Sequence, residues 1–262
     1  MSNRAGGRPL FEVRGLRKRY FGLTAVADLR LAVPPGAIVG LIGPNGSGKS
    51  TTIDCITGFQ APDAGRWFLD GAELTGQRPH CHAAAGVART FQTVRSYDEL
   101  SLRDNLIVAA QSRDGIGWLG ALAGGRALRR AEAAAARHAA DLLQTIGLAE
   151  QAGAPAGILS YGQRKLLAIA AAMMTRPKFV VLDEPVAGVN PSMILRIETL
   201  VRQLNETGVT FLIVEHNVEF IMSLCLSVIV MEQGRKIADG PPSLIRNDPR
   251  VLDAYLGAVV DE

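Results

Sequence analysis

The sequence predicts an α/β fold: a mostly parallel sheet with an antiparallel β layer at its N-terminal side and an inserted helical subdomain. Short apolar runs separated by helix-length segments indicate buried parallel strands that crossover connections join, namely 37–42, 179–182 and 211–214. From Leu10 to Val33 apolar and polar residues alternate, which is typical of antiparallel strands. An Ala/Arg-rich stretch at 126–146 has Leu and Ile at helical spacing and predicts a helix.

The elements follow in chain order. Gly15, Gly22 and Pro34 punctuate the alternating region, so it divides into short extended segments. The apolar run 37–42 leads into a glycine-rich turn and a helix that begins near Lys49. A strand, turn and strand are expected from Gly65 to Gly71, and the pattern is helical from about Val94 to Ile158.

One domain covering residues 1–262 is the simplest organisation, because 48% of the residues are hydrophobic and can form a core. We expect a catalytic core made of 10–92 and 158–240. Residues 93–157 form the helical insertion, and 241–262 form a C-terminal extension.

Composition excludes several classes of protein. The net charge is +3 and the basic residues form no runs, so no nucleic-acid partner is expected. No apolar stretch approaches the about 20 residues of a membrane-spanning helix, and Met1–Leu10 lacks the apolar centre of a secretory signal. Cys55, Cys81 and Cys225 fit reduced thiols, so we expect a cytoplasmic protein.

The run His80-Cys81-His82 contains residue types that bind metals. It has no fourth ligand at zinc-finger spacing, and it falls in a predicted surface loop. We therefore expect no metal site there.

A glycine-rich segment between a predicted strand and a predicted helix matches G-x-x-x-x-G-K-[ST], the pattern of a phosphate-binding loop. Glycines let backbone N–H groups converge on phosphate oxygens, and the helix N-terminus adds positive charge. Lys49 is expected on the β- and γ-phosphates and the Ser50 hydroxyl on Mg²⁺. The candidate nucleotide-binding residues are Gly43, Pro44, Asn45, Gly46, Ser47, Gly48, Lys49, Ser50 and Thr51.

The loop alone leaves GTPases, kinases and helicases open, and the second half of the chain narrows the choice. The run Leu159-Ser160-Tyr161-Gly162-Gln163 precedes the apolar strand that ends in Asp183-Glu184, and His216 follows the next strand. Together with Gln92, this ordered set resembles the ATPases of ABC transporters. The resemblance implies a P-loop NTPase fold of the ABC type, ATP hydrolysis coupled to transmembrane transport, and ATP and Mg²⁺ as cofactors.

The strand ends carry the expected catalytic residues. A carboxylate at the end of an apolar strand is costly unless it is paired or near a metal, so Asp183 is expected to hold Mg²⁺ through water. Glu184 is the candidate catalytic base, with a solvated turn as the alternative. The resemblance makes His216 a catalytic sensor of the γ-phosphate, although a lone histidine at a strand end is more often structural. It also gives Gln92 a contact with ATP and Mg²⁺.

The resemblance assigns further ATP contacts. Ser160, Gly162 and Gln163 would close on an ATP bound to the Lys49 loop of another subunit. Tyr20 matches the aromatic residue that stacks on adenine; Phe21 competes for that role, and either ring could be core.

Three positions depart from the family pattern. Tyr161 replaces a glycine, Asn190 replaces the usual aspartate, and Val186 replaces a small hydroxyl residue. We expect hydrolysis to be retained, while Asn190 puts the communication between two ATP sites in question.

Within the family, four segments look like the ATP-binding subunits of importers for branched-chain amino acids; urea, amide and aromatic-acid importers look similar. The segments are 115–122, 159–163, 187–191 and 247–257. The resemblance implies uptake of branched-chain amino acids or related small polar solutes through separate permease subunits. It implies a second related ATP-binding subunit or a homodimer, an indirect periplasmic or extracellular solute-binding partner, and peripheral attachment to the cytoplasmic face of the bacterial inner membrane.

Two alternatives remain within the same fold. One is the ATPase of an exporter or lipid-extraction system. The other is a soluble ABC ATPase acting in DNA repair or translation, although such proteins usually have two fused cassettes or long coiled coils, and this chain has neither.

Overall fold

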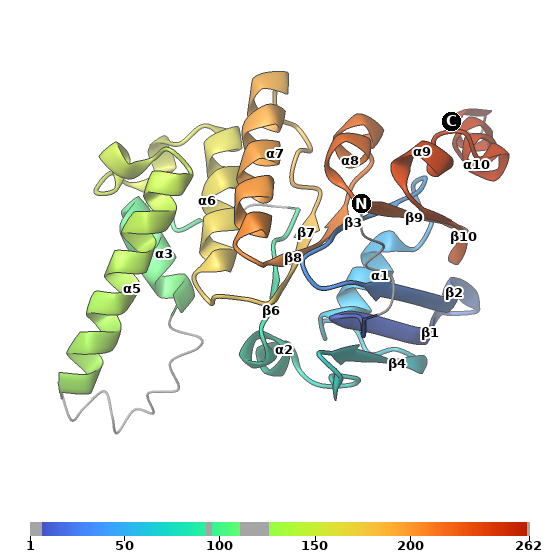
Figure 1. Ribbon diagram of the computed structural model, residues 1–262, viewed down its shortest axis with the longest axis horizontal. Helices are drawn as coiled ribbons and strands as arrows, with labels where there is room; N and C mark the ends of the chain where they lie inside the picture. The colour runs from blue at the N-terminus through green and yellow to red at the C-terminus, as the bar shows by residue number, and fades with distance from the viewer. Residues whose placement is uncertain (1–6, 93–95, 111–125, 261–262) are drawn as a thin grey trace.

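The computed structural model describes residues 7–92, 96–110 and 126–260 (Figure 1). Its main sheet has the strand order β10-β9-β3-β8-β7-β6, and only β10 runs antiparallel to its neighbour. The mostly parallel sheet is thereby confirmed. The strands are β3 (Ile38–Ile42), β6 (Val87–Arg89), β7 (Phe179–Asp183), β8 (Thr210–Val214), β9 (Ser227–Glu232) and β10 (Arg235–Gly240).

A second sheet is antiparallel, with the order β2-β1-β4-β5, and it confirms the predicted N-terminal layer. Its strands are β1 (Phe11–Tyr20), β2 (Leu23–Val33), β4 (Ala64–Leu69) and β5 (Ala72–Glu73). Helix α1 (Lys49–Ile56) packs against β1 and β2. The rings of Phe11 on β1 and Phe179 on β7 stack with centroids 4.4 Å apart, which joins the two sheets.

Alternate residues of the buried strands divide between two hydrophobic cores, as the twofold periodicity of a strand requires. On β3, Val39 and Leu41 belong to the core shared with the antiparallel sheet and α1. Ile38 and Ile42 belong to the core beneath the helices on the other face. Continuous apolar runs therefore mark strands that are covered on both faces.

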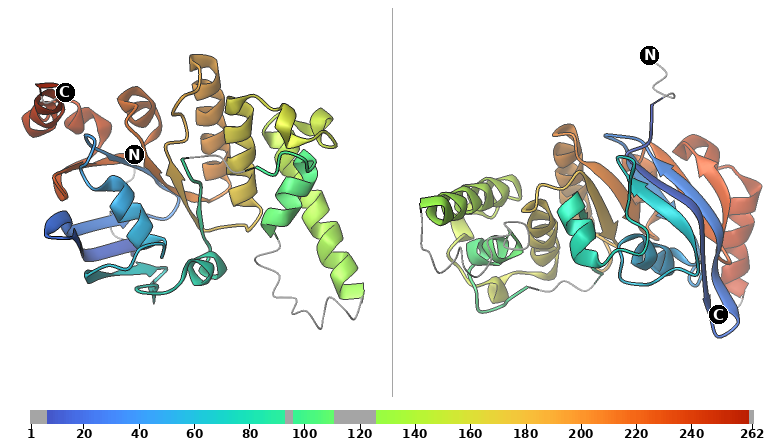
Figure 2. Two further views of the ribbon diagram at one scale, coloured as in Figure 1. Left: turned by 180° about the vertical axis from the view of Figure 1, so that it is seen from behind. Right: turned by 90° about the horizontal axis from the view of Figure 1, so that it is seen from below.

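Those helices are α6 (Tyr161–Met173), α7 (Pro191–Glu206) and α8 (Val218–Leu224). Helices α3 (Leu102–Ala110) and α5 (Arg126–Thr145) lie beyond α6 at one end of the molecule (Figures 1 and 2), followed by the short helices η1 (Ala149–Gln151) and η2 (Ala156–Ile158). The helix expected at 126–146 is confirmed by α5. The segment 115–122 lies outside the described residues, and the boundaries of core and insertion stay a prediction.

The C-terminal helices α9 (Pro242–Ile245) and α10 (Pro249–Val260) lie at the opposite end, beside β10 (Figure 1). Within the described parts of the chain, no helix is both long and apolar enough to span a membrane.

The surface loop expected around His80 is wrong, because residues Pro79–Ala85 form helix α2. Pro79 occupies the first helical turn, where its fixed φ favours a helix, and Gly86 ends the helix with φ 102°. His82 on this helix is only 1% exposed. Across 7–92, 96–110 and 126–260, no cluster of three or more His, Cys, Asp or Glu could hold a metal ion.

Candidate functional site

The phosphate loop joins the end of β3 to the start of α1, as expected. Gly43 has φ 152°, and a Cβ there would lie 2.1 Å from the Met231 carbonyl oxygen of β9. Gly48 has φ 99°, and its Cβ would lie 2.3 Å from the carbonyl oxygen of Ala25 on β2. Both positions admit only glycine, because the loop is pressed between the two sheets.

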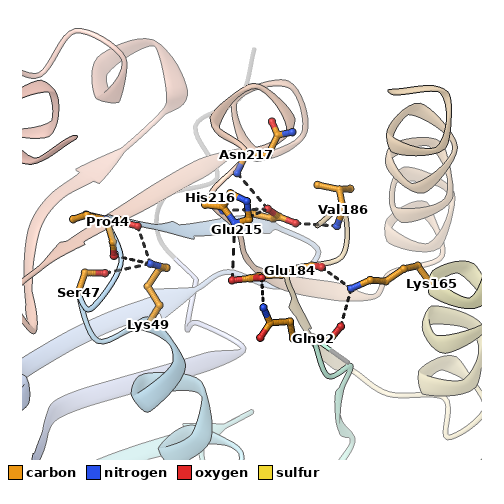
Figure 3. A network of polar contacts seen from close by, with 11 residues as sticks. Pro44, Ser47, Lys49, Gln92, Lys165, Glu184, Val186, Glu215, His216 and Asn217 are labelled. Atoms are coloured by element: carbon orange, nitrogen blue, oxygen red, sulfur yellow. Dashed lines mark hydrogen bonds and ion pairs between the residues drawn. The ribbon is translucent and has the colours of Figure 1, made fainter. Parts of the chain in front are cut away.

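Lys49 folds back onto this loop (Figure 3). Its Nζ donates to the carbonyl oxygens of Gly43 at 2.7 Å and Pro44 at 2.9 Å. Burial lowers the pKa of Lys49, and the nearby charge of Glu184 opposes that shift. An ammonium bound to neutral carbonyls can exchange them for phosphate oxygens at a gain, because hydrogen bonds between charged groups are stronger.

A cavity of about 450 Å³ opens over the loop. This volume is in the usual range for a small-molecule site. It is lined by the loop, by the start of β2 and by two residues from other segments: Leu23, Thr24, Ala25, Asn45, Gly46, Ser47, Gly48, Lys49, Ser50, Thr51, Glu184 and Gln233. The cavity therefore brings the predicted phosphate loop and the predicted base together.

Neither aromatic candidate for adenine stacking lines the cavity. Tyr20 ends β1, and its ring centroid lies 5.2 Å from Nζ of Lys18. Phe21 is fully exposed in the tight turn between β1 and β2, with φ 46°. The residues that follow the turn do line the cavity, and the choice between the two rings stays a prediction.

Asp183 lies at the end of β7, where Arg89 of β6 binds it. The Arg89 guanidinium donates to Asp183 Oδ2 at 3.0 Å and to Asp54 Oδ1 at 2.6 Å. Burial raises the pKa of Asp183, while the contact with Arg89 opposes that shift. The same guanidinium lies 5.0 Å and 5.4 Å from the ring centroids of Phe91 and Phe59. Arg89 has no motif that marks it in the sequence, although it ends strand β6 three residues before Gln92.

Glu184 follows directly and is held in the left-handed region, with φ 47°. Its N–H donates to the Val214 carbonyl at 2.9 Å, and its Oε2 accepts from Gln92 Nε2 at 2.7 Å (Figure 3). His216 Nδ1 lies 3.9 Å from Glu184 Oε1. Three predicted residues from separate segments are thus brought together.

Two buried residues missed by the sequence analysis hold this group. Lys165 on α6 is 3% exposed, and its Nζ donates to the main-chain oxygens of Gln92 at 3.0 Å and Glu184 at 2.9 Å. The carboxylate of Glu215 is fully buried. It accepts from the N–H groups of Val186 at 2.8 Å, His216 at 3.0 Å and Asn217 at 3.2 Å. A carboxylate inside an apolar strand end was the available signal for Glu215.

The Ser160 motif caps α6. Ser160 Oγ accepts from the Gln163 N–H at 3.3 Å, and Gln163 Oε1 accepts from the Ser160 N–H at 2.9 Å, which forms a capping box. A Cβ at Gly162 would lie 2.7 Å from the Met193 side chain of α7, so a larger residue here would require that side chain to move. No residue of the motif lines the cavity over Lys49.

The departures from the family pattern have local roles. Asn190 is the N-cap of α7, where its Oδ1 accepts from the Met193 N–H at 2.9 Å. Val186 is buried, and its N–H is the donor to Glu215. Tyr161 is 48% exposed in the first turn of α6.

The chemistry of three side chains suits Mg²⁺. Ser50, Gln92 and Asp183 offer hydroxyl, amide and carboxylate oxygens, and Mg²⁺ prefers oxygen ligands shared with phosphates. Asp183 is partly buried, and the Arg89 guanidinium already offsets part of the cost of its charge. Of these three residues, Ser50 lines the cavity over the loop, whereas Gln92 and Asp183 are not among its lining residues.

Family models match two parts of the chain. The model described as ABC transporter matches residues 26–187. The model described as Branched-chain amino acid ATP-binding cassette transporter matches residues 235–261. The first match contains the phosphate loop, and the second contains helix α10.

Curated relatives are similar over nearly the whole length. The chain is 43% identical to the high-affinity branched-chain amino acid transport ATP-binding protein BraF of Pseudomonas aeruginosa, and 40% identical to LivG of Escherichia coli (strain K12), described in the same words. Each match covers 95% of this chain and 98% of the relative. The lipopolysaccharide export system ATP-binding protein LptB of the same strain is 34% identical over 93% of this chain and 95% of its own.

Among solved structures, the ADP conformation of MJ1267, an ATP-binding cassette of an ABC transporter, has a TM-score of 0.84 and 31% identity. The match covers 96% of this chain and 100% of that one. A nucleotide-free cassette of an ABC transporter has a TM-score of 0.82 and 33% identity, covering 94% and 98%.

Proposed function

The chain belongs to the ABC transporter family of ATP-binding subunits, and we propose that it hydrolyses ATP to drive the import of branched-chain amino acids or related small solutes. The ATPase activity is supported above all by one observation: Lys49 and Glu184 line the same cavity. The match at residues 235–261 and the higher identity to BraF and LivG than to LptB support the importer.

Hydrolysis follows from the groups around the cavity. Lys49 exchanges its carbonyl partners for the β- and γ-phosphate oxygens of ATP, which spreads the charge of the leaving group. The Glu184 carboxylate accepts a proton from a water whose oxygen attacks the γ-phosphorus, and ADP leaves. Gln92 Nε2 and His216 Nδ1 lie on either side of that carboxylate and orient it. Mg²⁺, held by oxygens of Ser50, Gln92 and Asp183, would neutralise phosphate charge.

The site is completed by another subunit in this proposal. Ser160, Gly162 and Gln163 are absent from the lining of the cavity over their own Lys49 loop, and Ser160 is exposed. They are therefore available to close on the γ-phosphate of an ATP held by a second cassette. A related ATP-binding chain is the first choice for that partner, and a second copy of this chain is the alternative.

ATP-binding subunits of importers work with transmembrane permease subunits. We infer that the permeases of this chain contact the surface beside Gln92. There the rings of Phe59 and Phe91 are 53% and 44% exposed and lie edge to face, 5.3 Å apart. Exposed aromatic pairs next to a catalytic site suit a partner protein. A solute-binding protein would act indirectly, and the chain would lie peripherally at the cytoplasmic face of the inner membrane.

Uptake in a strain that lacks the gene tests the transported solute. We expect uptake of labelled leucine to fall, and the wild-type gene but not the Glu184→Gln gene to restore it. Uptake of labelled urea and of labelled short amides is measured in parallel, because these compounds represent the related small solutes named in the proposal. Loss of outer-membrane integrity with normal uptake of every solute would favour lipid extraction, for which the similarity to LptB is the supporting observation.

A further inference from the structure

Lys165 is a cationic side chain buried to 3% exposure in the first turns of α6. A buried ammonium is unfavourable unless its N–H groups are bound and anions lie near. Burial lowers the pKa of Lys165, and the carboxylates of Glu215, Glu184 and Asp183 oppose that shift. The buried ammonium of Lys165 is therefore stabilised by its hydrogen-bond acceptors and by these three carboxylates.

The ammonium ties two distant segments together (Figure 3). Its Nζ accepts nothing and donates to the carbonyl oxygens of Gln92 at 3.0 Å and Glu184 at 2.9 Å. The side chains of the same two residues bond to each other at 2.7 Å. Glu184 has a left-handed backbone conformation that residues other than glycine rarely adopt. The hydrogen bond from Lys165 to its main-chain carbonyl holds that backbone, and so keeps the Glu184 carboxylate in place.

Tyr161 connects this lysine to the motif at the start of α6. Its ring centroid lies 5.5 Å from Lys165 Nζ, one helical turn along the same face. A Cβ at Gly188, in the loop after β7, would lie 3.4 Å from Tyr161 Cε1, so the ring also borders that loop. The ring is half-exposed beside Ser160, on the surface where a second cassette would close.

We propose that Lys165 is a positioning residue for hydrolysis, which holds Glu184 and Gln92 and links them through Tyr161 to the Ser160 motif. Lys165 and Tyr161 thereby connect the hydrolytic residues at one ATP with the surface that meets the ATP of the second cassette. It also gives the tyrosine at the family's glycine position a specific purpose. The inference rests on the proposed ATPase function.

The test compares three variants of the purified chain with the wild type. Each is measured for its kcat at saturating Mg-ATP, its dissociation constant for ATP and its melting temperature. We expect Lys165→Met to lower kcat about tenfold or more, because two charge-assisted hydrogen bonds are lost. ATP affinity is expected to change less than about twofold, since the Lys49 loop is untouched. Lys165→Arg is expected to restore most of kcat, because a guanidinium also donates to carbonyls. The matched control Lys178→Met removes an exposed lysine paired with Asp70 and leaves kcat unchanged.

The tyrosine is tested with a second pair of variants. Tyr161→Phe keeps the ring, so kcat is expected to equal that of the wild type. Tyr161→Gly removes the ring, and we expect kcat to fall about two- to fivefold. If Lys165→Met fails to fold, Lys165→Arg and the two tyrosine variants still test the proposal. A wild-type kcat for Tyr161→Gly would overturn the proposed link from Lys165 through Tyr161 to the Ser160 motif.

The outcomes separate this inference from the proposed function. A wild-type chain that hydrolyses no ATP, either alone or together with a related ATP-binding chain, removes both. A wild-type chain that hydrolyses, with Lys165→Met equally active, removes only the inference. If Lys165→Met lowers kcat, affinity and melting temperature together and arginine restores nothing, Lys165 is merely structural and the inference is also overturned.

Discussion

The phosphate loop and Glu184 of the hydrolytic cluster line one cavity, but the loop and the cluster are built in different ways. The loop is the single segment 43–51, and its shape depends on glycines and on the carbonyls that bind Lys49. The hydrolytic cluster comprises Gln92, Lys165, Glu184, Glu215 and His216, which come from segments far apart in the chain. The loop is therefore recognisable from one contiguous segment, whereas the hydrolytic cluster forms only through tertiary packing.

Separating binding from turnover gives the largest expected effect. Glu184→Gln removes the proton acceptor but keeps the size of the side chain, so turnover is expected to fall by roughly 10²- to 10⁴-fold. The dissociation constant for ATP should stay near the wild-type value. Phosphate release and equilibrium nucleotide binding measure the two quantities. Turnover at the wild-type rate would show that the cluster lacks the base.

The opposite change is made in the loop. Lys49→Ala removes the cation from the phosphates, and we expect ATP affinity to fall roughly 10- to 100-fold. The melting temperature without nucleotide should change little, because the hydrogen bonds of Lys49 to Gly43, Pro44 and Ser47 lie within its own loop. Titration of ATP against both proteins provides the measurement. An unaltered affinity for ATP would contradict the proposed role of Lys49 in nucleotide binding.

The contrast explains what the sequence could predict. Gly43 to Ser50 form a contiguous motif whose spacing alone specifies a structure, and the apolar runs before Lys49 and Asp183 identify their strands. The adenine ring partner stays a prediction, because Tyr20 and Phe21 lie outside the cavity lining.

The buried charges could not be predicted in the same way. Lys165 follows Gln163 and Arg164 and looks like a solvated helix face, yet its Nζ meets two carbonyls supplied by distant segments. The position of Arg89 against Asp183 depends on the pairing of β6 with β7, which no local pattern specifies. By contrast, Pro79 and Gly86 were readable signals for helix α2.

The stability of the hydrolytic cluster can be probed at Glu215. Glu215→Gln replaces one acceptor oxygen with an N–H donor that faces backbone N–H groups, so the free energy of unfolding is expected to fall by about 1–3 kcal/mol. Turnover should fall as well, because the N–H groups on one side of the carboxylate, either that of Val186 or those of His216 and Asn217, lose their acceptor. Glu198→Gln is the control: its surface ion pair with Arg202 is worth less than about 1 kcal/mol. Chemical denaturation measures both, and equal losses would deny Glu215 a special role.

The smallest effect on the isolated chain is expected at Ser160. Ser160→Ala removes the capping box of α6 at a cost of about 1 kcal/mol in the free energy of unfolding. ATP affinity of the monomer should stay the same, since Ser160 does not line the cavity. Ser160→Asp keeps the cap but places a negative charge toward the γ-phosphate of a partner, so it should be stable and slow. A stable Ser160→Asp variant with wild-type turnover would contradict the proposed contact with ATP.

The most direct test of a site shared between two subunits is the rate of Mg-ATP hydrolysis per mole of chain over a hundredfold dilution. We expect this rate to fall on dilution, because the Ser160 motif of one subunit must close on the Lys49 loop of another. Glu184→Gln provides the baseline at every concentration. A rate per mole that stays constant to the lowest measurable concentration would contradict the account, because a single chain would then hydrolyse ATP alone.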